Sequence, residues 1–263
     1  MRDFPQELIN TVIDNLAEPD SSQQVPPDVS AYSIVSSKWL DQTRKHHFEF
    51  LDLKNQDAMD RWVAGVDAGQ SGASSYVRML YMCTIKSLEG FKAHIRALTG
   101  VTKAELWDCS FFRSPSDVRI LTGALGTNLA HLELGETRTT PEVLVSLLAG
   151  LPKLEALYTL SLAVEHDENT PSLSTEGIQF FDGGKNRLRI LLDDPAEPKQ
   201  FSWVPSTAKF SRLGFGTSGM LHDLGFVNKL VSSSRETLTY FVIDQDIDSM
   251  CLNLSRVAFE YSS

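Results

Sequence analysis

A short apolar motif returns at nearly even intervals along most of this chain, and it limits the possible folds more than any other feature. Its frame is Leu-x-x-Leu-x-Leu-x-x-Asn/Cys, most legible over residues 101–109 and 129–137 and looser over residues 238–246. Apolar residues that alternate over so few positions are typical of a short β-strand with one buried face. The Asn or Cys side chain that closes the frame can satisfy backbone groups where the chain turns. Each copy therefore predicts a strand followed by a turn.

Strand-like and helix-like segments alternate along the chain. The strand candidates are residues 48–53, 77–83, 101–106, 129–134, 157–162, 188–192, 210–215, 238–243 and 254–259. Helical patterns lie between them at residues 56–66, 88–98, 116–125, 141–149 and 221–231. Most successive strand starts are roughly 23 to 31 residues apart, the period of leucine-rich repeats. Because one strand–helix unit cannot bury its own apolar face, the units must stack, and we expect an α/β solenoid with parallel strands over residues 54–263.

The first 53 residues follow a different pattern. Apolar residues recur there at spacings of three and four, which predicts a helix with one apolar face. These residues are Phe4, Leu8, Ile9, Val12, Ile13 and Leu16. Residues 29–40 predict a second short helix, and residues 43–48 a third helical piece. Helices this short bury too little surface to be stable alone, so we expect residues 1–53 to pack on a partner protein or on the rest of the chain.

The same stretch resembles the F-box of fungal F-box proteins. The resemblance rests on Phe-Pro-x-Glu-Leu-Ile-x-x-Val-Ile-x-x-Leu, then Tyr-Ser-Ile-Val-Ser-Ser-Lys-Trp-Leu, then Arg-x-x-x-Phe, in that order. Two features depart from the family pattern. The loop over residues 18–28 is longer and richer in proline than usual, and Tyr32 stands where the family often has a small residue or Cys. Taken with the later repeats, the chain is similar to fungal F-box proteins with irregular leucine-rich repeats.

The resemblance implies a non-catalytic substrate-recognition subunit of a cullin-based (Skp/cullin/F-box) ubiquitin ligase. The F-box would bind the Skp-type adaptor and through it a cullin, while the solenoid would bind a substrate protein. Catalysis would belong to other subunits, so this chain would supply effective concentration and orientation. The positions that match the family motif, and that the resemblance assigns to adaptor contact, are Phe4, Pro5, Leu8, Ile9, Ile13, Val35, Trp39 and Leu40.

Two other functions stay open. The chain could be a stand-alone interaction scaffold whose N-terminal helices cap the solenoid, because a terminal repeat needs a cover for its exposed core. Burial of Leu8 and Ile13 against residues 54–100 would favour that cap. The chain could also be an enzyme that binds a dinucleotide at the glycine-rich segment from Gly214 to Gly219, where glycines would let a pyrophosphate approach a helix N-terminus. Against this, the preceding residues 209–213 are too polar for a strand buried on both faces, and a repeat turn explains the glycines without a cofactor.

Few residues stand out as a catalytic or binding site. The sequence contains no Gly-x-Ser-x-Gly motif and no metal-binding spacing of His or Cys, so we expect no catalytic residue, no cofactor and no metal. The sequence does not mark the substrate-binding residues. Most of the aromatic residues are expected in the core, and the candidates for outward-facing substrate anchors are the three that lie in or beside predicted turns: Phe111, Phe112 and Trp203.

Charge and cysteine content narrow the class of partner. The formal net charge of -10 argues against a general nucleic-acid binder. No run of about 18 apolar residues occurs, so no membrane span is expected. Cys83, Cys109 and Cys251 lie far apart in sequence, which fits buried thiols in a reducing compartment. We therefore expect a cytoplasmic or nuclear protein whose partners are other proteins.

Overall fold

The structure, a computed structural model, describes residues 6–17, 37–67, 71–165, 178–182, 185–192, 203–205, 207–217, 224–245 and 257–260. Within these ranges the strands of the main sheet are β1 (Phe50–Leu53), β2 (Met79–Cys83), β3 (Lys103–Trp107), β4 (His131–Gly135), β6 (Ala156–Leu160), β8 (Arg187–Leu192), β9 (Arg212–Thr217), β10 (Tyr240–Gln245) and β11 (Val257–Glu260). A separate pair is formed by β5 (Arg138–Thr139) and β7 (Ala163–Val164). A strand occurs at each of the nine predicted places, although residues 254–256 of the last prediction lie outside the described residues. The prediction that all strands are parallel is wrong for β11.

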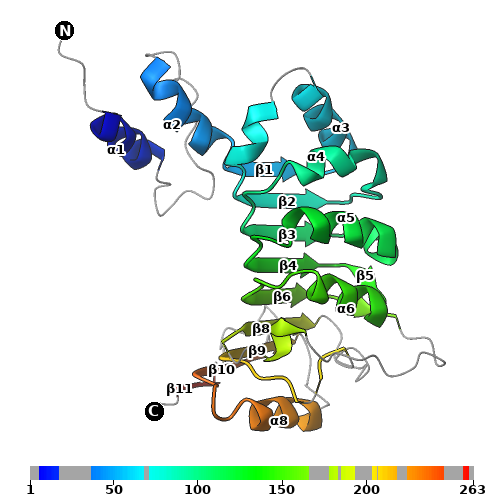
Figure 1. Cartoon of the computed structure of the whole chain (residues 1–263). Coiled ribbons are helices and arrows are strands. Elements are labelled where there is room, and N and C mark those ends of the chain that lie inside the picture. Colours follow the sequence, from blue (N-terminus) through cyan, green and yellow to red (C-terminus); the bar gives the residue numbers. More distant parts are fainter. Residues whose placement is uncertain are drawn as a thin grey trace, which may run out of the picture.

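The main sheet follows chain order. Its strands lie in the order β1-β2-β3-β4-β6-β8-β9-β10-β11, so each strand pairs with the next one along the chain (Figure 1). Every pair from β1 to β10 is parallel, whereas β11 pairs antiparallel with β10. Parallel neighbours need a crossover connection, and a helix or short helical turn supplies most of these connections. The chain is therefore an α/β protein with a mostly parallel sheet that stays open.

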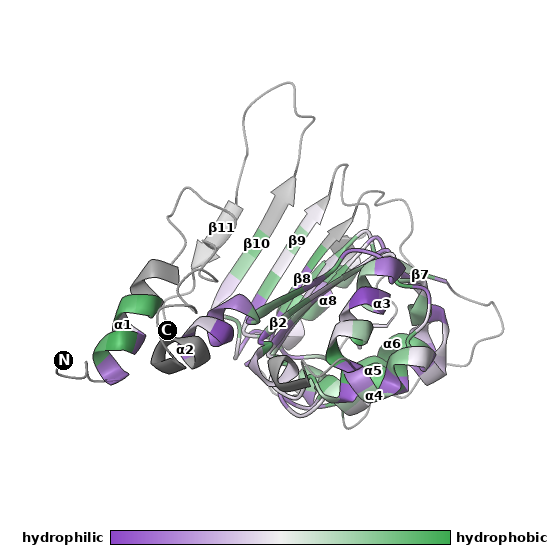
Figure 2. Ribbon diagram, turned by 90° about the horizontal axis from the view of Figure 1, so that it is seen from above, coloured by the Kyte–Doolittle hydropathy of each residue, from purple (hydrophilic) through white to green (hydrophobic). Residues whose placement is uncertain are grey.

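Five of the eight helices in the described residues lie together on one side of the sheet. The bounds of all eight are α1 (Gln6–Ala17), α2 (Ser37–His47), α3 (Gln56–Gly65), α4 (Lys92–Arg96), α5 (Pro115–Leu125), α6 (Pro141–Ala149), α7 (Gln179–Asp182) and α8 (Leu224–Ser233), with the 3-10 turns η3 (Ser71–Tyr76), η4 (Glu89–Phe91) and η5 (Ser110–Arg113). Seen along the stack of strands, α3, α4, α5, α6 and α8 all lie on the same side (Figure 2). Among the described residues, no helix combines the length and the apolarity needed to cross a membrane.

Local sequence explains where these helices begin. Asn55, Ser114 and Thr140 are the N-caps of α3, α5 and α6, and each side-chain oxygen accepts a hydrogen bond from the backbone amide three residues later. Proline follows directly at the first position of α5 and α6, where an amide would have no helical partner. The predicted range of α6 is confirmed to the residue. The expected third helical piece over residues 43–48 is wrong, because residues 43–47 are the last turns of α2.

The eight parallel strands share one unbroken register, so equivalent residues form straight rows across the sheet. One row faces the helices and is buried or packed on the core: Leu51, Leu80, Ala104, Leu132, Leu157, Leu188, Leu213 and Phe241. A second inward row includes Leu53, Met82, Leu106, Leu134, Thr159, Ile190 and Phe215. Burial of these apolar rows contributes about 25 cal/mol per Å2 of apolar surface, so a slip in register would expose a whole row.

A repeated backbone hydrogen bond holds that register. The carbonyl just before β1, on Glu49, accepts from the amides of Arg78 and Met79 at 2.8 and 3.0 Å. The carbonyls that precede five later strands each accept two backbone hydrogen bonds in the same way: those of Arg78, Thr102, Ala130, Asn186 and Ser211. Each unit thus supplies the acceptor that positions the next unit, which satisfies backbone groups that would otherwise be unpaired.

The chain leaves each early strand through a left-handed residue. Such residues follow β2, β3, β4 and β6 directly, with φ between 46° and 53°: Thr84, Asp108, Glu136 and Ser161. The Thr84 amide then donates to the Trp107 carbonyl at 3.0 Å, and the Glu136 amide donates to Leu160 at 2.8 Å. A non-glycine residue in this conformation costs roughly 1–2 kcal/mol, which the cross-unit hydrogen bond offsets in part.

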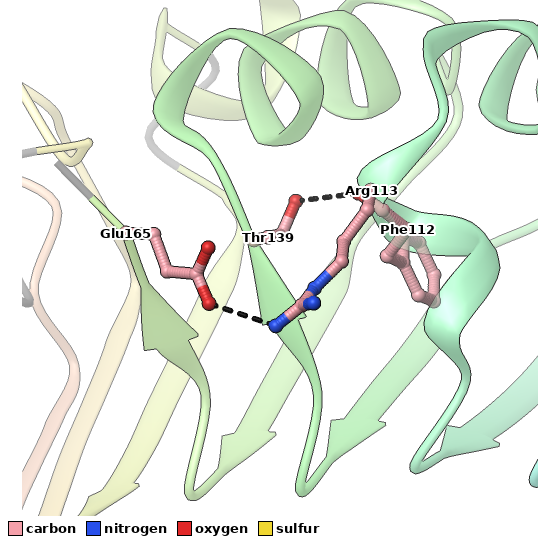
Figure 3. A network of polar contacts seen from close by, with 4 residues as sticks. All are labelled: Phe112, Arg113, Thr139 and Glu165. Atoms are coloured by element: carbon pink, nitrogen blue, oxygen red, sulfur yellow. Dashed lines mark hydrogen bonds and ion pairs between the residues drawn. The ribbon is translucent and has the colours of Figure 1, made fainter. Parts of the chain in front are cut away.

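Side chains join neighbouring units beyond the strand ends (Figure 3). The Thr139 hydroxyl, buried in β5, donates to the carbonyl of Phe112 at 3.1 Å. An exposed ion pair joins Arg113 Nη2 to Glu165 Oε1 at 2.9 Å and spans the unit between them. Buried Asp117 in α5 makes a further link of this kind, because its carboxylate accepts a hydrogen bond from the Leu88 amide at 2.8 Å.

Replacing Asp117 tests this link. Asp117→Ala leaves the buried Leu88 amide without an acceptor, so we expect the free energy of unfolding to fall by about 1–3 kcal/mol in urea titrations. The control is Asp60→Ala on the exposed side of α3, which should change stability by no more than about 0.5 kcal/mol. Equal effects of the two substitutions would contradict the role given to Asp117.

Candidate functional site

The face of the sheet that points away from the helices carries side chains from each of the eight parallel strands. Because strand residues alternate between faces, this open face displays its own lateral rows. The first row is Phe50, Met79, Lys103, His131, Ala156, Arg187, Arg212 and Tyr240. The second row is Asp52, Tyr81, Glu105, Glu133, Tyr158, Arg189, Gly214 and Val242. Most of these side chains are exposed or half-buried, which makes the open face the natural interaction surface of the sheet.

Acidic side chains collect at the β1–β4 end of the open face. Asp52, Glu105 and Glu133 stand in one row, and Lys103 forms an ion pair with Glu105. Burial first, and the Glu105 charge second, raise the pKa of Glu133 above its ordinary value, although Lys103 and Arg189 act in the opposite direction. Glu105 and Glu133 are register partners on adjacent strands, so their mutual repulsion favours a bound cation between them.

Tyr81 lies inside this acidic group. Burial, then its side-chain hydrogen bond with Cys83 and the charges of Cys83, Asp52 and Glu105, raise the pKa of Tyr81 to about 12. The phenol is therefore neutral at physiological pH and offers a hydrogen-bond donor among carboxylates. Oδ1 of Asp52 is buried and has no hydrogen-bond partner among the described residues.

Basic side chains collect at the β8–β9 end. Arg187, Arg189 and Arg212 are exposed on two adjacent strands, whose partner residues lie about 4.8 Å apart. The Arg212 guanidinium carbon lies 5.9 Å from the centre of the Tyr240 ring, within cation–π range. A cavity of about 150 Å3 opens between these groups, and its lining includes Tyr158, the arginines, Gly214 and Tyr240. Guanidinium groups beside a cavity of this kind form a site for a carboxylate or phosphate.

Gly214 makes room for this arrangement. A Cβ atom at this position would lie 3.1 Å from Arg189 Cγ and 3.3 Å from Val242 Cγ1, so the missing side chain lets Arg189 lie across β9. Residues 214–217 are the last four residues of β9. The predictions of a repeat turn or of a dinucleotide loop over these glycines are therefore wrong for residues 214–217. Gly219 lies outside the described residues.

The predicted substrate anchors are also wrong. Phe111 and Phe112 are each 1% exposed, and Trp203 is 3% exposed. The two phenylalanine rings, 4.6 Å apart, belong to the 3-10 turn η5, whose side chains fill the space between β3 and α5. Trp203 packs near Phe181, with ring centres 6.4 Å apart. These aromatic residues stabilise the core and are not available to a partner.

The predicted adaptor-binding residues fall into three groups. Leu8, Ile9 and Ile13 lie on α1, and their side chains are described. Trp39 and Leu40 lie in α2, whose first five side chains are outside the described set. Positions outside the described residues are Phe4, Pro5 and Val35. Only the α1 group can therefore be placed in three dimensions.

The apolar face of α1 is divided. Ile9 and Ile13 are 4% and 0% exposed, whereas Leu8 and Val12 are 51% and 45% exposed. Helix α1 packs on α2, and α2 packs on η3. Both buried isoleucines are separate from the main apolar core. Leu8 and Val12, four residues apart on one helix, form an exposed apolar strip.

Chemical groups for metal binding are not assembled in the described part of the chain. No group of three or more His, Cys, Asp or Glu side chains is arranged there to hold a metal ion. Burial raises the pKa of the Cys109 thiol to about 12, and Cys83 is half-buried. Cys109 is therefore protonated and unreactive at physiological pH.

Two glycine substitutions test the packing of the open face. Gly135→Ala would place a Cβ within 2.4 Å of the Trp107 ring, so we expect a loss of about 1–3 kcal/mol in the free energy of unfolding. The same change at Gly123, in open space on α5, should stabilise the protein by up to about 1 kcal/mol. Losses of equal size from both would contradict the placement of Trp107 over Gly135.

The raised pKa of Glu133 predicts a pH dependence. Between the ordinary pKa of glutamate and the higher folded-state value, the folded protein binds more protons, so Glu133 lowers stability as pH rises through that window. Glu133→Gln should therefore raise the free energy of unfolding at pH 7. The gain should shrink below about pH 4.3, where glutamate is protonated in both states. A loss of stability at pH 7 would contradict the assignment.

Comparisons with known proteins do not place the chain in a family. No protein-family model matches the sequence, and a search of curated proteins finds no significant match. Any functional conclusion therefore depends on the two surfaces described above and on the sequence resemblance.

Proposed function

We propose that the chain is a non-catalytic substrate-recognition subunit of a Skp/cullin/F-box ubiquitin ligase. In this proposal α1 and α2 form an F-box that binds a Skp-type adaptor. Residues 54–263 form a leucine-rich-repeat-like solenoid, and its open face binds the substrate protein. The two surfaces together would hold the substrate near the catalytic subunits of the ligase.

The observation that carries the proposal is the exposed strip on α1. Leu8 matches the F-box-like motif and is 51% exposed, and Val12 extends the strip by one helical turn. Because about half of each side chain is already buried, burying the remainder would contribute about 0.7–1.5 kcal/mol for each residue to binding a partner. Of the large apolar side chains among the described residues, only Phe50 is similarly exposed, at 43%.

The repeating units support the solenoid part of the proposal. Strand starts at residues 50, 79, 103, 131, 156, 187, 212 and 240 are separated by 29, 24, 28, 25, 31, 25 and 28 residues. These intervals mostly lie within the repeat lengths of leucine-rich-repeat proteins, roughly 20–29 residues. Each strand also adds to one edge of the sheet in chain order, as stacked repeats do.

A second candidate is a stand-alone scaffold in which α1 and α2 cap the solenoid. The burial of Ile9 and Ile13, together with the packing of α2 on η3, favours this candidate. The two candidates differ in what they require of Leu8 and Val12. A cap needs neither side chain, whereas an adaptor-binding helix needs an apolar surface that faces away from the chain.

Charge substitutions on the exposed strip of α1 distinguish the adaptor-binding subunit from the capped scaffold. Leu8→Asp with Val12→Asp places charges at exposed positions, so the fold should persist, and co-purification with a Skp-type adaptor should fall at least tenfold. The control is Ala64→Asp, an exposed position on α3, which should retain the adaptor. The unfolding midpoint of each variant is measured in parallel.

Two outcomes would contradict the proposal. The first is a wild-type chain that does not bind the adaptor. The second is a Leu8→Asp, Val12→Asp variant that binds the adaptor as well as the wild type does. Either outcome would leave the capped scaffold as the better account.

A further inference from the structure

The open face is divided into regions of opposite charge. In its first two rows, β1–β4 carry three acidic residues, Asp52, Glu105 and Glu133. Asp52 forms an ion pair with Lys54 and Glu105 forms one with Lys103. In the same rows, β8 and β9 carry three arginines and no acidic residue. Strand β6 separates the two regions and contributes only Ala156 and Tyr158 to these rows. A chain with a net charge of -10 therefore concentrates positive charge on one part of one face.

We propose that the open face binds an extended peptide segment of a partner protein that runs across the strands, with acidic or phosphorylated residues on Arg187, Arg189 and Arg212 and basic residues on Asp52, Glu105 and Glu133. This inference rests on the proposed function, because it specifies the substrate that the solenoid would recognise. The complementary charges decide which end of the peptide lies over which strands.

The spacing of the strands sets the length of the peptide. Two strand spacings separate Glu133 on β4 from Arg189 on β8, and six separate Asp52 on β1 from Arg212 on β9. At about 4.8 Å per spacing these distances are roughly 10 and 29 Å, which an extended chain covers with about three and nine residues. The peptide should therefore carry its two charged groups on either side of a neutral stretch of about three residues.

The arginine region fits an anionic side chain in particular. Exposed guanidinium groups bind a carboxylate or phosphate through two parallel hydrogen bonds. The cavity of about 150 Å3 beside them has Gly214 at its floor and the Tyr158 and Tyr240 side chains in its lining. An acidic residue would therefore find both charge partners and aromatic surface at one place.

The acidic region fits a cation for a different reason. Glu105 and Glu133 stand on adjacent strands in register, and their mutual repulsion contributes to the raised pKa of Glu133. A lysine or arginine placed between them would relieve that repulsion. Neutral Tyr81 beside them offers a hydrogen-bond donor and an aromatic ring.

Fluorescence anisotropy with the full chain tests the inference. The probes are labelled nine-residue peptides: three Lys, three Ala and three Glu in block order, the reverse block order, and the same residues in alternation. A second set replaces Glu with phosphoserine. One of the block orders should bind at least tenfold more tightly than the alternating peptide, and added salt should weaken it. Equal binding of block and alternating peptides would overturn the inference, as would the absence of binding.

Charge reversal locates the site. Arg187→Glu with Arg189→Glu should reduce binding of the block peptide at least tenfold. The same variant should gain at least tenfold in affinity for a peptide of six Lys and three Ala, because β8 then carries two acidic residues where the wild type has two basic ones. This gain cannot come from misfolding. The control, Arg119→Glu with Arg235→Glu, makes the same change in net charge at exposed positions outside the sheet and should bind as the wild type does. Unchanged peptide binding by the Arg187→Glu, Arg189→Glu variant would overturn the inference.

Adaptor binding, measured on the same preparations, separates the two proposals. Adaptor binding without peptide selectivity would overturn only the inference about the open face. Selective peptide binding without adaptor binding would overturn only the ligase assignment.

Discussion

The structure depends on one backbone interaction that recurs from unit to unit. The carbonyl that precedes a strand accepts hydrogen bonds from the first amides of the next unit, beginning with Glu49 and continuing to Ser211. This interaction sets where each strand starts, so the strands cannot slip against one another without losing it. Equivalent apolar residues therefore lie side by side on the inner face of the sheet, and equivalent charged residues lie side by side on the outer face. The same register that buries the core therefore also builds the candidate binding surface.

Helices α1 and α2 lie outside this system of hydrogen bonds. They adjoin the β1 end of the sheet, whereas the arginines lie several strands away on β8 and β9 (Figure 1). Ile9 and Ile13 anchor α1 locally, which leaves Leu8 and Val12 to solvent. The division of one amphipathic helix into an anchored side and an exposed side is the geometry that an adaptor-binding segment requires. Two surfaces with different chemistry thus occupy separate parts of one chain.

Sequence patterns predicted the fold better than they predicted the surfaces. The strands were predictable because the inward residues of each strand are nearly all apolar, as in Leu132 and Leu134. The antiparallel pairing of β11 was not predictable, because the apolar pattern of a strand does not encode the direction of that strand. Phe111 and Phe112 lie beside a turn, a position that favours exposure, but η5 turns both rings into the core, so their prediction as anchors is wrong.

The arginine region was missed, although its signal is present in the sequence. Arg187 and Arg189 flank a buried leucine, and Arg212 precedes another, so alternation alone places all three on one face. The alternation of buried and exposed residues does not show which strands are neighbours in the sheet. Only the chain-order topology brings β8 beside β9 and places these strands two and three positions from β4, which carries Glu133.

We expect the chain to hold an adaptor and a charged peptide on two independent surfaces. Anisotropy titration with the block peptide, with and without a saturating Skp-type adaptor, measures this independence. The peptide should have the same dissociation constant in both titrations, and all three components should sediment together. Displacement of the peptide by the adaptor would contradict independent binding.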